Sequence, residues 1–276
     1  MFLVTGATGN VGAEVVRALV GSGVPVRAVT RDPAKVAPLS GVEYVAGDLS
    51  RPESLEPALD GARGLFLLPG YAGMPALLDS ARRAGVQRVV LLSGSSAGSG
   101  DLSNAITRYM AESERAVRAS SLLWTVLRPS GFMSNTFQWV GQIKAGDVVT
   151  VPFANVPIAN VDPHDIGAVA ARALVTDGHD GRIYQLTGPR ALLPADRLRV
   201  LGAVLGRDLE LRAQPDDEAR AEMLKTTPVE YVDAFFSFYV KGSLDDSVVT
   251  STVADVTGVP PRTFEQWAVA HADSFR

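Results

Sequence analysis

The feature that most constrains the fold is a glycine-rich loop near the start of the chain. Residues 5–12 read Thr-Gly-Ala-Thr-Gly-Asn-Val-Gly and lie between an apolar run that predicts a strand and a segment with the apolar spacing of a helix. Glycines at this spacing permit a sharp turn, a close approach of the backbone to a pyrophosphate, and tight packing of helix on strand. A purely structural turn is the alternative. The loop predicts a dinucleotide site, with contacts expected from Gly6, Thr8, Gly9, Asn10, Val11 and Gly12.

Short apolar runs alternate with helix-type segments through the first half of the chain. Several of these runs are apolar throughout, as parallel strands buried on both faces are. The alternation predicts right-handed crossovers and an α/β fold with a doubly wound parallel sheet, which is the Rossmann architecture. Six strands are expected, at residues 2–5, 24–30, 42–46, 64–68, 86–93 and 122–128.

The regular alternation ends at about residue 150. Asp162 and Pro163 predict the start of a helix, and short strands are expected at residues 183–187 and 209–212 among several helices. We therefore expect a cofactor-binding Rossmann domain over residues 1–182. A smaller, mainly helical, substrate-binding lobe is expected over residues 183–276, with a contribution from residues 152–162.

The composition excludes several classes of protein. No cysteine is present, so disulfides, thiolate zinc sites and cysteine nucleophiles are excluded. The 26 basic residues are scattered among 30 acidic ones, which argues against a nucleic-acid partner. His164, His179 and His271 have no ligand-like spacing, so no metal is expected. No apolar stretch approaches the ~20 residues that span a membrane, and we expect a cytoplasmic protein without a membrane partner.

The residues that follow the second and third strands indicate which dinucleotide is bound. A protein that holds the ribose 2′-hydroxyl of NAD usually offers an acidic side chain where this chain has Arg31. A guanidinium can pair with a 2′-phosphate, which favours NADP(H). The neighbouring Asp32 precedes Pro33 and is interpreted as a helix N-cap. Asp48 is placed where it could accept a hydrogen bond from the adenine amino group, and an ordinary loop aspartate is the alternative.

Several motifs resemble those of the atypical short-chain dehydrogenase/reductase group typified by NmrA-like proteins. The resemblance runs from residue 1 to at least Leu174. It is carried by the glycine loop and by Thr30-Arg31-Asp32-Pro33, Gly47-Asp48-Leu49, Leu67-Leu68-Pro69, Thr125-Val126-Leu127-Arg128-Pro129 and Phe132-Met133-Ser134-Asn135.

The resemblance implies an NADP-binding fold whose relatives include quinone and azo-dye reductases, other small-molecule reductases, and regulators that sense the cofactor. It places Leu68 and Pro69 along the cofactor, with contacts also expected from Leu49 and Ser93. Residues near the nicotinamide and the substrate would be Pro129, Phe132 and Met133, and Tyr71 is added to the expected substrate pocket.

The sequence lacks the tyrosine and lysine pair that the large short-chain reductase families use for proton transfer. None of its lysines, Lys35, Lys144, Lys225 and Lys241, follows a tyrosine by four residues. Tyr109 is the best-placed tyrosine, but without a nearby cation its pKa should stay near about 10. Ser95, beyond the fifth strand, is the preferred hydrogen-bond donor.

These observations predict an NADPH-dependent oxidoreductase that transfers hydride to a small aromatic or quinone-like molecule. The alternatives are a non-catalytic NADP-sensing regulator with a protein partner and an isomerase or epimerase that retains NADP. Residues 94–98 match the Gly-x-Ser-x-Gly elbow of serine hydrolases, but no helix is expected directly after the serine. The aromatic run at residues 235–239 is interpreted as core rather than as a pocket or a subunit interface, and a homodimer is compatible with the sequence.

Overall fold

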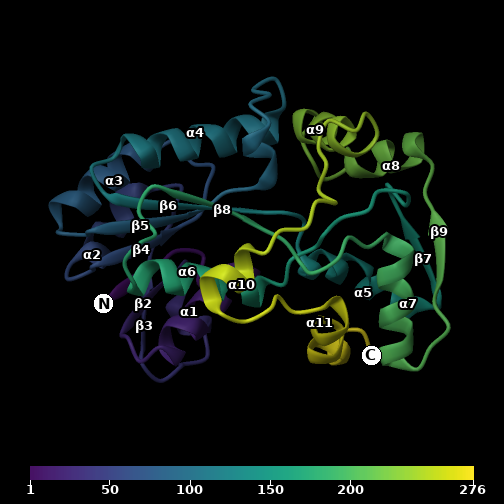
Figure 1. Ribbon diagram of the computed structural model, residues 1–276, viewed down its shortest axis with the longest axis horizontal. Coiled ribbons are helices and arrows are strands. Elements are labelled where there is room, and N and C mark those ends of the chain that lie inside the picture. Colours follow the sequence, from purple (N-terminus) through teal and green to yellow (C-terminus); the bar gives the residue numbers. More distant parts are fainter.

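A parallel sheet of seven strands forms the centre of the computed structural model, which describes residues 1–276 (Figure 1). All six expected strands are present, so the predicted α/β doubly wound fold is confirmed. The strand order reverses at β1, between β2 and β4, and ligands of such sheets bind beyond the carboxyl ends of the strands at this point. In spatial order the strands are β3 (Val42–Ala46), β2 (Val26–Thr30), β1 (Phe2–Val4), β4 (Gly64–Leu67), β5 (Arg88–Leu92), β6 (Leu123–Pro129) and β8 (Arg182–Leu186).

Helices cover both faces of this sheet, because its central strands are apolar on both sides. On one face α1 (Asn10–Gly21) packs against α6 (Pro163–Val175), and their apolar sides form a core cluster with β1 and β2. On the other face a second cluster lies under α2 (Glu56–Leu59), α3 (Met74–Arg83) and α4 (Ala105–Ala119). None of the helices combines the length and the apolar character needed to span a bilayer.

The C-terminal part of the chain forms a lobe beside the sheet (Figure 1). Two parallel strands, β7 (Val148–Val151) and β9 (Glu210–Ala213), pair with each other there. A third core cluster includes Trp139, Leu201, Trp267 and Phe275. The helices of this lobe are α5 (Val140–Ala145), α7 (Pro194–Leu205), α8 (Asp216–Met223), α9 (Val229–Tyr239) and α11 (Phe264–His271), and between the last two the chain forms α10 (Thr252–Thr257).

The strand expected at residues 183–187 lies in the main sheet, which corrects its expected place in the second lobe. It is β8, and its residues pair with β6, as Val126 does with Ile183. α10 also packs against α6 and β8, so the chain returns to the main sheet after forming much of the lobe. Pairing between strands more than fifty residues apart leaves no local pattern in the sequence, which explains the error.

The two predicted N-caps form as expected. The Asp32 carboxylate accepts a hydrogen bond from the Ala34 N–H at 3.2 Å, and the Asp162 carboxylate accepts one from the His164 N–H at 2.9 Å. Each aspartate precedes a proline at the first helical position, where a missing N–H costs nothing.

Candidate active site

The glycine loop between β1 and α1 is tightly folded. Gly6 has a φ of +61°, in the left-handed region that favours glycine. A Cβ added to Gly12 would lie 2.1 Å from the Gly6 carbonyl oxygen, so the helix can approach the loop only without a side chain there. The Gly9 N–H donates to the same oxygen at 2.9 Å. The loop is thus a cradle that side chains at these positions would fill.

The start of α1 offers free backbone donors to this cradle. Its N-cap is Gly9, which has no side chain to cap the first turn, and Thr8, Gly9 and Asn10 are exposed. No side chain caps the N–H groups of the first helical turn, and these groups carry the positive end of the helix dipole. Val11, by contrast, is buried in the core and offers only its backbone. A pyrophosphate fits this donor set.

The loop is anchored to the neighbouring strand through Thr5. Its buried hydroxyl donates to the Phe66 carbonyl oxygen at 3.0 Å and accepts from the Leu68 N–H at 3.2 Å. Leu68 packs directly over Gly6, since a Cβ added to Gly6 would lie 2.4 Å from the Cδ1 atom of Leu68. Leu68 and Pro69 therefore border the cradle, half-buried at the end of β4.

Arg31 extends from the end of β2 without a protein partner. It is exposed, and it makes no hydrogen bond or ion pair in the structure. The Asp32 carboxylate beside it caps the following turn and pairs with the Lys35 ammonium at 3.0 Å. Asp32 is therefore engaged elsewhere, and Arg31 is left beside it as an exposed cation without an ion pair.

Asp48 and Leu49 follow β3 and have local roles in the structure. The Asp48 carboxylate accepts hydrogen bonds from the Ser50 hydroxyl at 2.7 Å and the Ser50 N–H at 2.9 Å, and these bonds lower its pKa. Leu49 packs against the second core cluster. Asp48 keeps its negative charge and has further lone pairs with which to accept an adenine amino group.

A cavity of about 190 Å³ opens beyond the carboxyl ends of β5 and β6. It brings together four of the expected site residues, which are Ser93, Ser95, Pro129 and Phe132. Ile106 and Met110 close it from α4, where residues four apart share one face of the helix. The pocket is apolar with a few hydroxyl groups, as small-molecule sites are.

The Ser93 hydroxyl donates a hydrogen bond to a buried carboxylate, Glu114, which the sequence did not predict as a site residue. It donates to Glu114 at 2.7 Å, and Glu114 also accepts from Arg128 at 2.7 and 2.8 Å. Burial acts to raise the pKa of Glu114, but hydrogen bonds from Arg128 and Ser93 prevail and lower it. This cluster fixes the wall of the cavity at Ser93.

Asp246 is the second buried carboxyl group that sequence reasoning missed. It lines the same cavity as Ser95, and its Oδ1 has no hydrogen-bond partner. Burial raises the pKa of Asp246, and the nearby Ser95 side chain and Gly131 backbone oppose that rise. The two residues lie about 150 positions apart in the chain, so no motif links them.

Tyr109 lies outside this cavity. Ile106 and Met110 line the cavity and Tyr109 does not, and its ring packs edge-on against Tyr231 with centroids 6.2 Å apart. Burial and the neighbouring Tyr231 raise its pKa above the ordinary value. The expectation of an ordinary pKa is therefore wrong, and Tyr109 is placed for packing.

Tyr71 and Met133 also lie away from the cavity linings. The Tyr71 ring packs against the second core cluster, and burial raises the pKa of its unpartnered hydroxyl. Met133 is 2% exposed and belongs to the third core cluster with Trp139. Both residues follow strand ends, but their side chains turn into apolar layers that the sequence alone does not locate.

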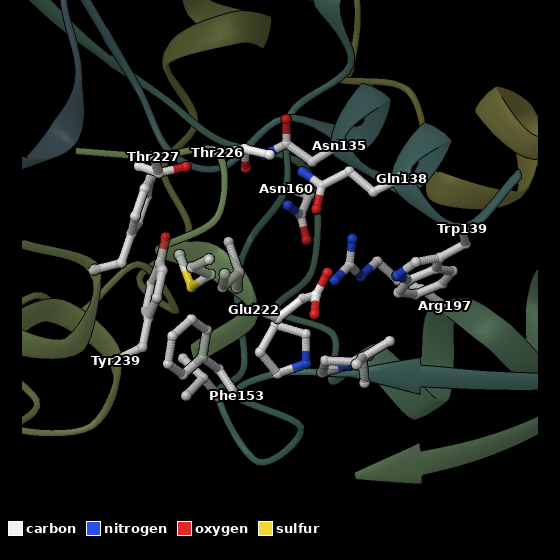
Figure 2. A pocket seen from close by; sticks show the side chains of 17 residues that line it. Asn135, Gln138, Trp139, Phe153, Asn160, Arg197, Glu222, Thr226, Thr227 and Tyr239 are labelled. Carbon is white, nitrogen blue, oxygen red and sulfur yellow. The ribbon is translucent and has the colours of Figure 1, made fainter. Parts of the chain in front are cut away.

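A larger cavity, of about 640 Å³, lies in the C-terminal lobe (Figure 2). Asn135, Phe235 and Tyr239 line both this cavity and the smaller one, so the two adjoin. This corrects the interpretation of the aromatic run as core, because two of its members form the shared wall. The side chains labelled in Figure 2 are Asn135, Gln138, Trp139, Phe153, Asn160, Arg197, Glu222, Thr226, Thr227 and Tyr239.

Comparisons with known proteins agree with this geometry. A (4-alkanoyl-5-oxo-2,5-dihydrofuran-3-yl)methyl phosphate reductase of Streptomyces griseus is 37% identical, with coverage of 100% of this chain and 99% of the relative. An NAD(P)H azoreductase of Xenophilus azovorans is 36% identical, with coverage of 100% and 99%.

Among solved structures, an NADPH-dependent quinone oxidoreductase of Escherichia coli in complex with NADPH superposes with a TM-score of 0.80. It is 23% identical and covers 98% of this chain and 99% of its own, which shows a shared fold.

A family model described as NAD(P)H-binding matches residues 6–177. That span takes in the glycine loop, Arg31, Ser95 and α6, and it exceeds half of the chain. The chain therefore belongs to the NAD(P)H-binding family, and its predicted resemblance to NmrA-like atypical short-chain dehydrogenases/reductases is confirmed.

Proposed function

We propose that the protein is an NADPH-dependent reductase that transfers hydride to a small aromatic or quinone-like molecule. The observation that carries this proposal is that the glycine cradle after β1 and the apolar cavity after β5 and β6 open at the same edge of one sheet. Two relatives with whole-chain coverage are reductases, one of them an azoreductase.

The choice of NADP(H) over NAD(H) rests on Arg31. Its guanidinium is exposed and unpaired, while Asp32 is engaged by its cap and by Lys35. Gly6, Gly9 and Gly12 would hold the pyrophosphate, with the free N–H groups of α1 as donors.

The chain's own residues suggest where the proton for the product is held. The bound cofactor supplies the hydride. Asp246, whose pKa burial raises, retains a proton to higher pH than an ordinary carboxyl group, and it lines the same cavity as Ser95. We assign the proton source to Ser95 and Asp246, in place of the tyrosine and lysine pair that this sequence lacks.

Replacement of Arg31 tests the cofactor assignment. Arg31→Ala should weaken NADPH binding by about 1.5–3 kcal/mol and leave NADH binding nearly unchanged, because only NADPH carries the third phosphate. Calorimetric titration measures both. Lys35→Ala, which removes a nearby exposed cation already paired with Asp32, is the matched control and should change neither affinity.

A substrate panel tests the reductase assignment. We expect oxidation of NADPH in the presence of quinones, azo dyes or conjugated enones, followed by its absorbance. Tight NADPH binding without turnover would contradict the proposal and favour a cofactor-sensing regulator. Cofactor that co-purifies and is not consumed would favour an isomerase. The cytoplasmic location and the lack of a nucleic-acid partner stay predictions, and a homodimer stays compatible with the sequence.

A further inference from the structure

The large cavity contains a buried cation with no counter-charge. Arg197, on α7, is 8% exposed, and Figure 2 shows its guanidinium pointing into the cavity. Its Nη1 donates to the Thr136 hydroxyl at 3.3 Å, and its Nε has no partner. The guanidinium carbon lies 5.0 Å from the centre of the Trp139 ring, within the range of a cation–π contact.

Other partly buried arginines of this protein are neutralised by carboxylates. Arg27 pairs with Glu43, Arg88 with Asp177, and Arg128 with Glu114, each at 2.7 or 2.8 Å. Arg197 is more deeply buried than these, yet it has no ion pair. Burying a cation is costly unless it is paired and hydrogen-bonded, so the unused donors of Arg197 require a partner from outside the chain.

No carboxylate of the protein supplies that partner. Glu222 lines the same cavity, but it is exposed and forms its ion pair with Lys225. Asp246 lines the adjoining cavity beside Ser95. Burial lowers the pKa of Arg197 to about 10, so the group remains cationic at neutral pH.

We propose that Arg197 binds an oxyanion of the substrate, such as a carboxylate, sulfonate or phosphate, and that the protein therefore acts on anionic aromatic or quinone-like molecules. This inference rests on the proposed function in one respect, because it takes the large cavity as the distal part of the reductase's substrate site. The shared lining by Asn135, Phe235 and Tyr239 supports that continuity. The reducible group would lie by Ser95, and the anion would lie against Arg197.

A binding measurement tests the anion site without requiring turnover. Calorimetric titration with 1-naphthyl phosphate and with the neutral 1-naphthol compares two ligands that share the same ring system. We expect the phosphate to bind at least about 10-fold more tightly to the unmodified protein, as charge-assisted hydrogen bonds to a guanidinium permit. Equal affinities would overturn the proposal, and this comparison requires no variant.

Variants on α7 assign the effect to one side chain. Arg197→Gln should remove most of the preference for the phosphate and leave 1-naphthol binding unchanged, while Arg197→Lys should retain part of it. Arg199→Gln is the matched control, because Arg199 lies on the same helix, is exposed and pairs with Asp196. A similar loss of preference in both glutamine variants would contradict the role of Arg197.

The outcomes separate this proposal from the proposed function. A preference for 1-naphthyl phosphate that Arg197→Gln abolishes, in a protein that reduces nothing in the panel, would support the anion site and refute the reductase. Reduction of neutral and sulfonated quinones with equal KM in the unmodified protein would support the reductase and overturn the anion site.

Discussion

At the scale of single residues, Gly12 shows how one missing atom shapes the cofactor cradle. Gly12→Ala places a Cβ 2.1 Å from the Gly6 oxygen, so α1 must shift away from the loop. We expect a loss of about 1–3 kcal/mol in the free energy of unfolding and weaker NADPH binding, measured by urea denaturation and calorimetry. Gly21→Ala, in the same helix with open space around its Cβ, should be neutral or stabilising. If Gly12→Ala and Gly21→Ala lost the same free energy of unfolding, close packing at Gly12 would be excluded as the cause of the loss.

Asp246 should make stability depend on pH. Since burial raises the pKa of Asp246, the folded state binds this proton more tightly than the unfolded state. The stabilisation that protonated Asp246 gives the folded state is complete below the pKa of about 4 in the unfolded chain. It is lost as the pH rises through the higher pKa of Asp246 in the folded state. Asp246→Asn should therefore gain stability relative to the unmodified protein as the pH rises from about 4 to about 7, measured by urea denaturation.

The exposed Asp101 provides the control for this pH effect. Hydrogen bonds from Ser103 lower its pKa, which gives the opposite sign. Asp101→Asn should not gain stability as the pH rises. A gain for Asp246→Asn that is the same at every pH would show that titration of this carboxyl group is not its source.

At the scale of elements, Asn104 joins the two helices that wall the small cavity. Its side chain caps α4 by accepting from the Ile106 and Thr107 N–H groups, and its amide donates to the Ala234 carbonyl oxygen of α9 at 3.2 Å. Asn104→Ala should cost about 2 kcal/mol of stability and raise KM, because it removes the cap and the hydrogen bond that joins α4 to α9. Asn104→Ser, which keeps a capping hydroxyl, should cost about half as much. Equal losses in urea denaturation would contradict a separate role for the amide.

At the scale of the whole molecule, the chain crosses between the sheet and the lobe more than once, so we expect the two to unfold together. α10 packs on the main sheet, and the following α11 packs on α7 in the lobe. The last core residue, Phe275, is fully buried against Trp267 in the lobe. Phe275→Ala should cost about 3–5 kcal/mol, whereas the exposed Val269→Ala should change stability by less than about 0.5 kcal/mol.

The prediction for Phe275→Ala is checked by two probes of urea unfolding. In a Trp124→Phe background, tryptophan fluorescence reports on the lobe through Trp139 and Trp267, and circular dichroism reports on the helices of the whole chain. Coincident transitions that shift together in Phe275→Ala are expected. A fluorescence transition that moves alone would show that the lobe unfolds independently.

Local physics alone made much of this protein predictable. The glycine loop, the first six strands and the N-caps at Asp32 and Asp162 depend on residues within one turn or one strand of each other, so their patterns are written in adjacent positions. The NAD(P)H-binding family followed from the same local motifs.

Only the tertiary structure decided which side chains share a cavity. It placed β8 in the main sheet, turned Tyr109 and Met133 into packed layers, and brought Asp246 to Ser95. It also left Arg197 as a buried and unpaired cation, although in the sequence Arg197 looks like any other arginine on a helix. Burial, pairing and orientation depend on contacts between segments far apart in the chain, and those contacts are chosen by the packing of the whole core rather than by any local pattern.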